Sequence, residues 1–277
     1  MITLMLTNTV PVARPAARRA PRLRRLLAGA AGMALALTGA LPLAAAPAPA
    51  AAAPQVVHAK AKFAPASYAV TGPIGKRYRK LGGANGRLGA PIGPQRCHKP
   101  TGVCSQRFKR GAIIHDRDAI KKVVHAFGKP QRAAYLAVAR AYVGYREPRV
   151  RGSKWNEWIG NDRAWCGFFN AWVSRASLNG NRYPKADHYT KQIAVMRQRG
   201  TMLKKPQRGA FMFIDRVGNG KPAHGGLIVR VKKNGDVVTI DGNAPHPKSN
   251  TRKGRRYVVQ RSQDTSQAVM YWRPPGW

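Results

Sequence analysis

Three side chains in the second half of the chain have the types and the order that nucleophilic acyl transfer uses. Cys166 lies in the segment DRAWCGFFNAWVSRA, His224 in KPAHGGLIVRV and Asp241 in TIDGN. In such a set the imidazole takes the proton of the thiol, and the thiolate attacks a carbonyl carbon. A carboxylate holds the imidazole in the useful tautomer. We therefore treat the three as candidate catalytic residues.

Cys166 must be positioned by a helix. The spacing of Phe169, Trp172 and Val173 predicts a helix over residues 164–178 with one apolar face. A thiol in the first turn of that helix feels the positive end of the helix dipole, which lowers its pKa and favours the nucleophilic thiolate. The alternative is an inert buried cysteine, since free cysteines are among the most buried residues.

His224 and Asp241 must be positioned by strands. His224 directly precedes a predicted strand, and the two glycines after it leave room beside the imidazole. In TIDGN, period-two alternation puts Ile240 on the buried face and points Asp241 and Asn243 the other way together. A carboxylate or amide there can orient the imidazole. The alternatives are a loop histidine without a role and a plain Asp-Gly turn.

This region predicts helices first and strands afterwards. Residues 131–143 have a near-helical apolar pattern and precede the predicted helix of Cys166. Short apolar runs bounded by Gly, Asn and Asp then predict strands over residues 210–214, 226–231, 237–240, 257–261 and 268–272. That order predicts an α+β fold with a small antiparallel sheet.

Residues 131–277 resemble the CHAP family of papain-like cysteine amidases and peptidases that act on peptidoglycan. AWCGFFNAWV resembles the nucleophile helix, and PQRGAFMFIDRVGNGKPAHGGLIVRVKKNGDVVTIDGN resembles the stretch from the first core strand to the third catalytic residue. The resemblance implies a papain-like domain in which N-terminal helices pack on the sheet. It also implies Cys166 as nucleophile, His224 as base and Asp241 as orienting carboxylate. The family often has Glu-x-Asn where this chain has Asp-x-Asn, so Asn243 could share or take the orienting role.

The resemblance implies a secreted hydrolase that cleaves an amide or peptide bond of peptidoglycan, as an N-acetylmuramoyl-L-alanine amidase or an endopeptidase. The backbone amide of Cys166 would be one oxyanion donor, with Asn156 and Asn161 as candidates for a second. No cofactor is implied, and the other histidines lack the HExxH or Cys/His spacing of a metal site. The alternative is a catalytically inactive, cationic wall-binding protein on the same scaffold.

Residues 1–53 predict a secretory signal peptide. They contain arginines but no Asp or Glu, and an apolar run from Leu26 to Ala46 leads into an Ala/Pro tract. The alternative is an uncleaved membrane anchor, because the run is long for a signal peptide. We expect cleavage and a secreted protein, extracellular or associated with the cell wall, with no stable membrane insertion. Residues 54–66 are interpreted as a linker.

Export also determines how the three cysteines are interpreted, since thiols outside the cytosol tend to pair. Cys97 and Cys104 flank a turn-like segment, and their spacing suits a disulfide that closes a hairpin. Cys166 is left without a partner, which indicates an intermolecular bridge or a reactive group.

Residues 67–127 predict a small Gly-rich unit. Ile74, Tyr78 and Leu81 have helical spacing, and a short strand pair is expected around Gly111. The segments GPIGKRYRKLGGANGRLGAPIG and CSQRFKRGAIIHDRD resemble one LGFP repeat of secreted actinobacterial proteins. The resemblance implies association with the cell wall. The alternative is a passive spacer.

Charge is the abnormal feature of the composition. The chain has 50 Lys and Arg against 10 Asp and Glu, a net charge of +40, yet 44% of its residues are hydrophobic. The apolar content excludes a wholly disordered polycation, and the charge predicts a polyanionic partner. We expect peptidoglycan and anionic cell-wall polymers as partners of a monomer. Nucleic acid is the rival class, but no zinc finger, RNP motif or basic amphipathic helix supports it.

Overall fold

The computed structural model describes residues 68–186, 188–246 and 254–277. The predicted signal peptide (1–53) and linker (54–66) lie outside these residues, as does the first residue of the predicted 67–127 unit. Among the described residues, no helix combines the length and the apolar character that crossing a bilayer requires.

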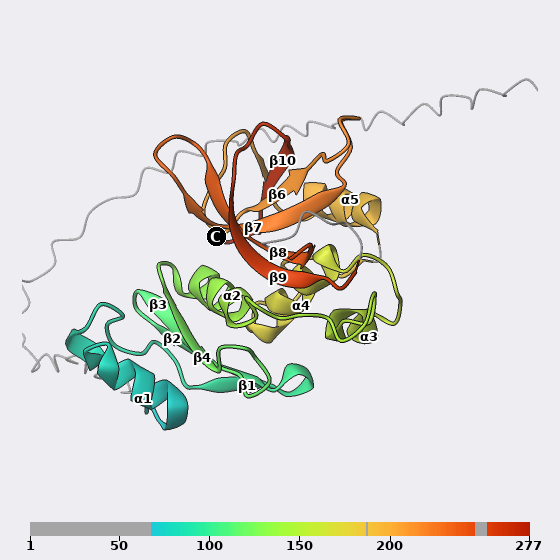
Figure 1. Ribbon diagram of the computed structural model, residues 1–277. Helices are drawn as coiled ribbons and strands as arrows, with labels where there is room; N and C mark the ends of the chain where they lie inside the picture. Colours follow the sequence, from blue (N-terminus) through green and yellow to red (C-terminus); the bar gives the residue numbers. More distant parts are fainter. Residues whose placement is uncertain (1–67, 187, 247–253) are drawn as a thin grey trace, which may run out of the picture. The chain divides into compact units, whose positions relative to one another are not determined.

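The first part of the described chain is a helix packed on a four-stranded antiparallel sheet, drawn in cyan to green in Figure 1. Helix α1 (Gly72–Lys80) buries Ile74 and Tyr78 against the sheet, and the Tyr78 ring stacks on Phe108 with centroids 4.7 Å apart. The helix ends where Gly82 adopts a φ of 85°. The strands follow the order β1 (Arg96–His98), β2 (Val103–Phe108), β3 (Gly111–His115) and β4 (Val123–Phe127).

The second part begins with four helices. They are α2 (Pro130–Ala141), α3 (Lys154–Ile159), α4 (Cys166–Ala176) and α5 (Tyr189–Arg199). The sequence predicts α2 and α4 but not α3 or α5. Helix α3 has only six residues and α5 buries only three side chains, so neither presents the long apolar face that makes a helix visible in sequence.

A six-stranded antiparallel sheet follows, drawn in orange to red in Figure 1. Its strands lie in the order β5-β10-β6-β7-β8-β9. Their bounds are β5 (Thr201–Leu203), β6 (Phe211–Ile214), β7 (His224–Val231), β8 (Val237–Ala244), β9 (Tyr257–Gln263) and β10 (Ala268–Arg273). All five predicted strands are present, with β5 in addition. The mixture of helices and antiparallel strands confirms the α+β class.

Helix α2 joins the two parts in one hydrophobic core. It contacts β2, β3 and β4 as well as α4, and its run of alanines lets these neighbours approach closely. Ile114 of the four-stranded sheet belongs to the same apolar cluster as Leu136 of α2 and Phe169 of α4. The described residues between 68 and 277 therefore belong to one compact unit, within which the regions predicted as 67–127 and 131–277 share a core.

Helix α4 is buried on nearly every side. All its residues except Arg175 are buried, because α2, α3, β7 and β8 contact it. Large aromatic rings surround it, and Trp155 of α3 stacks on Trp165 with centroids 4.7 Å apart. This packing fixes the N-terminus of α4, and with it Cys166, against the sheet.

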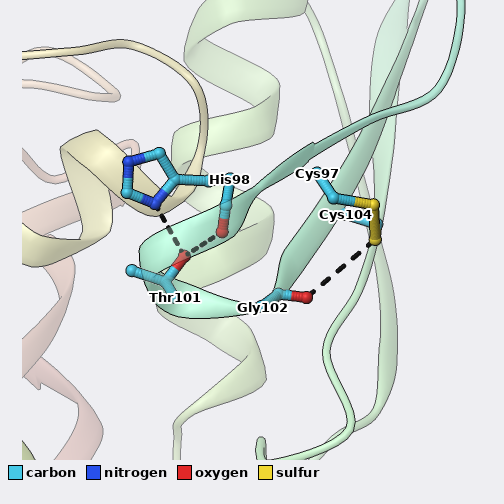
Figure 2. The surroundings of a disulfide bond; sticks show 5 residues. All are labelled: Cys97, His98, Thr101, Gly102 and Cys104. Carbon is cyan, nitrogen blue, oxygen red and sulfur yellow. Dashed lines mark hydrogen bonds between the residues drawn. A yellow bond between two sulfur atoms is a disulfide. The ribbon is translucent and has the colours of Figure 1, made fainter.

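The structure joins Cys97 and Cys104 by a disulfide (Figure 2). The two residues lie directly opposite each other in the β1–β2 ladder. Beside them, His98 Nδ1 and Thr101 Oγ1 are 3.0 Å apart, and Gly102 adopts a φ of 70° in the turn. The bond therefore closes a hairpin and holds β1 in register with β2.

Candidate active site

Cys166 is the first residue of α4 and lies at the wall of a cavity of about 670 Å³. Its side chain is 3% exposed. The first amides of a helix have no intrahelical acceptor, and the Gly167 N–H uses this freedom to hydrogen-bond the thiol. The other two cysteines form the disulfide, so Cys166 is the free thiol of this sequence.

Neighbouring strands bring His224 and Asp241 to this thiol. His224 begins β7 and Asp241 lies near the end of β8; since the two strands are antiparallel neighbours, both residues lie at the same end of the ladder. The His224 Nε2 atom is 3.2 Å from Asp241 Oδ2. The imidazole also forms a hydrogen bond with the Cys166 thiol. The structure thus brings all three candidate catalytic residues together.

Asp241 is fully buried, and strand β9 supplies two further partners that the sequence analysis misses. Arg261 Nε lies 3.1 Å from Asp241 Oδ2, and Gln263 Nε2 donates to the same oxygen at 3.2 Å. Gln263 also donates to Thr239 Oγ1. Arg261 and Gln263 are two residues apart on β9 and therefore lie on one face of the strand. This period-two polar pattern is the feature of the sequence that could have pointed to them. These contacts fix the carboxylate that orients His224.

Asn243 does not take part in this network. No contact between Asn243 and His224 is among the interactions of the described residues. The β8–β9 register shifts between Asp241 and Ala244, and Asn243 adopts a left-handed φ of 56°. Strict alternation therefore fails after Asp241, and the expectation that the two side chains point the same way does not hold. β8 is also buried on both faces from Val237 to Gly242, rather than on one.

The glycines after His224 make room for other groups than the imidazole. A Cβ on Gly225 would lie 2.3 Å from the Phe211 ring, and one on Gly226 would lie 2.1 Å from Asp241 Oδ1. The two glycines therefore accommodate the Phe211 ring and the Asp241 carboxylate, and not the His224 imidazole as the sequence suggests. Gly226 lets the Asp241 carboxylate sit against β7, at the place from which it reaches His224.

Tyr189 is a fourth group at the thiol. It is the first residue of α5, and its hydroxyl donates a hydrogen bond to Cys166 Sγ. Its ring packs edge-on against Phe213 of β6, with centroids 5.4 Å apart. No sequence pattern marks this residue, because α5 is not apparent in the sequence and only tertiary packing brings it to α4.

The charges of the site favour a thiolate and an imidazolium. Burial alone would raise the pKa of Cys166, but the hydrogen bond and charge of His224 and the bond from Tyr189 bring it below its usual value. Burial alone would lower the pKa of His224, but Asp241 and Cys166 raise it above its usual value. Burial likewise opposes ionisation of Asp241, yet His224 and Arg261 keep its pKa low. The imidazolium therefore stabilises the thiolate and the carboxylate, and both anions stabilise the imidazolium.

Asn156 is not available as an oxyanion donor. Asn156 Nδ2 donates to the carbonyl oxygens of Asn161 and Arg163 at 2.9 and 2.8 Å, so both of its amide protons are in use. Its Oδ1 accepts from Ser153, completing a capping box at the start of α3. Asn161 Oδ1 accepts from the Arg163 N–H. Asn161 is not among the described residues that line the cavity beside Cys166, whereas the Tyr189 hydroxyl donates to the thiol.

The cavity beside Cys166 is cationic. Arg163, Arg197 and Lys221 line it, and none of its described lining residues is acidic. Within the described part of the chain, no group of three or more His, Cys, Asp or Glu side chains could hold a metal ion. The described groups at the site are thus a buried thiol, an imidazole paired with a carboxylate, and cations along the cavity wall.

Comparison with known proteins assigns no family. No family model, no curated protein and no solved structure matches this chain. The functional conclusion therefore depends on the geometry around Cys166.

Proposed function

We propose that this protein is an exported cysteine hydrolase that cleaves an amide or peptide bond of peptidoglycan. One observation carries the proposal: Cys166 at the start of α4 is hydrogen-bonded to His224, whose Nε2 pairs with the buried Asp241. The sequence resemblance of residues 131–277 to the CHAP family supports a papain-like arrangement and a wall substrate. The cationic cavity supports the same substrate, because peptidoglycan stem peptides carry carboxylates.

In the first half of the reaction, the Cys166 thiolate attacks the carbonyl carbon of the scissile bond. The proton that left the thiol resides on His224, where Asp241 stabilises the imidazolium. The negative charge moves to the carbonyl oxygen of a tetrahedral intermediate. Backbone N–H groups at the start of α4 and the Tyr189 hydroxyl are the donors placed to stabilise it.

In the second half, His224 gives its proton to the leaving amine as the carbon–nitrogen bond breaks, leaving a thioester on Cys166. Neutral His224 then removes a proton from water, and the hydroxide formed attacks the thioester carbon. Breakdown of the second tetrahedral intermediate releases a carboxylate product and returns the thiolate–imidazolium pair. No group outside the three residues and water is consumed.

Incubation of purified sacculi with the protein tests the proposal. We expect the wild type to release soluble fragments, and Cys166→Ala to release them at least ~10³-fold more slowly, because it lacks the nucleophile. Mass spectrometry of the new ends separates cleavage at the N-acetylmuramoyl–L-alanine bond from cleavage within the peptides. The Cys166→Ala variant should still pellet with sacculi.

A cationic wall-binding protein without catalysis is the second candidate, and the net charge of +40 favours it. It predicts that wild type and Cys166→Ala pellet equally with sacculi and that neither releases fragments. That result would reject the hydrolase.

A further inference from the structure

A second cavity, of about 590 Å³, lies away from Cys166 and shares no lining residue with the first. One wall is the β1–β2 hairpin with the segment before it. The other wall is the C-terminal end of α4 and the loop that follows, represented by Arg175 and Gly180. The proposed reaction uses none of these residues, so the cavity needs a separate explanation.

The hairpin presents four polar side chains to this cavity from one face. Arg96 is paired with Ser105 in the β1–β2 ladder, and His98 and Arg107 are two residues further along their strands. Residues directly opposite each other, and residues two apart on one strand, point to the same side of a sheet. The disulfide joins the intervening Cys97–Cys104 pair and so holds this array in register.

The described residues that line the cavity include three arginines and no carboxylate. Arg96, Arg107 and Arg175 form no ion pair within the described residues. Arg107 donates only to neutral acceptors, the Leu178 carbonyl at 3.0 Å and Asn179 Oδ1 at 3.3 Å. Burial, then the charges of Arg182 and Arg96, lower the pKa of its guanidinium. Cations gathered without a counter-ion repel one another, and an anion between them relieves that repulsion.

Ser105 is a second, independent sign of a ligand. Ser105 is 3% exposed and lines the cavity, and its hydroxyl has no hydrogen-bond partner among the described residues. A buried polar group without a partner costs free energy, and native structures contain few of them. A hydroxyl between two arginines is suited to donate to the same anion that the guanidinium groups bind.

The rim adds apolar surface. Ile92 and Tyr68 line the cavity and are 46% and 39% exposed, respectively. They offer contact area to the carbon skeleton of a ligand that extends beyond one charged group. A polymer of repeating units fits a cationic cavity with an apolar rim better than an isolated ion does, because only one unit of the polymer needs to enter the cavity.

We propose that this cavity binds a phosphate group of a polyol-phosphate polymer, with Arg96, Arg107, Arg175 and Ser105 around the phosphodiester oxygens. A guanidinium matches phosphate oxygens in paired hydrogen bonds. Naming the wall as the source of the polymer rests on the proposed function, whereas phosphate recognition does not. Binding here would hold the protein on the wall while the distant Cys166 cavity stays open to substrate.

Titration calorimetry with poly(glycerol phosphate) at fixed ionic strength tests this proposal. We expect the wild type to bind, and Arg96→Gln to bind about tenfold more weakly, since Arg96 is exposed and has no described partner to lose. The control is the pair Arg79→Gln and Arg117→Gln, exposed residues that do not line the cavity. This control removes more charge yet should reduce affinity less.

Ser105→Ala separates ligand binding from folding. Removal of an unpartnered buried hydroxyl should leave the melting temperature unchanged or raise it, while affinity for the polymer falls by about the same factor. Equal binding by wild type, Arg96→Gln and Ser105→Ala would overturn the proposal. Equal cavity-dependent binding of polyglutamate or of single-stranded DNA would overturn it too, in favour of a carboxylate or a nucleic-acid ligand. Release of wall fragments is measured on the same variants, so the proposed hydrolase activity is tested independently of polymer binding.

Discussion

At the residue scale, the site depends on opposite shifts in the pKa values of Cys166 and His224. The lowered pKa of Cys166 and the raised pKa of His224 both favour the thiolate–imidazolium pair, which we expect to be the active form. Activity should therefore follow a bell-shaped pH profile. It falls on the acid side as the thiolate is protonated, and on the alkaline side as the imidazolium loses its proton.

Asp241→Asn should narrow the pH range of activity from both its acid and its alkaline side. Loss of the carboxylate lowers the pKa of His224, and the unpaired Arg261 charge lowers it further. With less imidazolium beside it, the Cys166 thiol holds its proton to higher pH. We expect kcat/KM to fall by about 10²- to 10⁴-fold, measured across pH on released peptide fragments. An unchanged profile would show that Asp241 does not orient His224.

Tyr189→Phe should slow the reaction about 10- to 100-fold, because a hydrogen bond to a charged group contributes about 1.5–3 kcal/mol. The pKa of Cys166 should rise, so the acid limb of the profile moves to higher pH while the alkaline limb stays. Tyr183→Phe is the matched control, since Tyr183 is buried close by and its hydroxyl has no partner in the described part of the chain. Equal effects of the two substitutions would assign Tyr189 a packing role only.

At the element scale, the close approach of β7 and β8 positions the carboxylate. Gly226→Ala would place a Cβ 2.1 Å from Asp241 Oδ1, and the buried carboxylate must move away from His224. We expect kcat/KM to fall by about 10²-fold, with a pH profile like that of Asp241→Asn. Gly225→Ala crowds the Phe211 ring instead. Gly225→Ala should lower the free energy of unfolding by about 1–3 kcal/mol and leave the pH profile of activity unchanged.

The elements also show what sequence can predict here. Apolar runs and helical spacing predict α2, α4 and five strands of the larger sheet, and with them Cys166, His224 and Asp241. The bulge in β8 that turns Asn243 aside has no such signal, because alternation is a local pattern and the bulge is set by pairing with β9. Tyr189 and Arg261 reach the site only through tertiary contacts, so their roles needed the structure.

At the scale of the whole molecule, the shared core links the small sheet to the rest of the unit, and the disulfide closes the β1–β2 hairpin within that sheet. Replacing both Cys97 and Cys104 by Ala should cost about 2 kcal/mol, because the unfolded chain regains the freedom of a short loop. The melting temperature should fall by about 4–8 °C. Calorimetry checks this, and the release of wall fragments below the transition should be unchanged. A loss of that activity would show that the hairpin supports the Cys166 site directly.

The central claim is that His224 activates Cys166 as a nucleophile, and the rate of alkylation by iodoacetamide against pH tests it most directly. Since Cys97 and Cys104 are paired, alkylation of the folded protein reports on Cys166 alone. We predict fast alkylation with an apparent pKa below the ordinary thiol value of about 8.5, and a rise of that pKa in His224→Ala. An unreactive thiol, or the same ordinary thiol pKa in both proteins, would contradict the account.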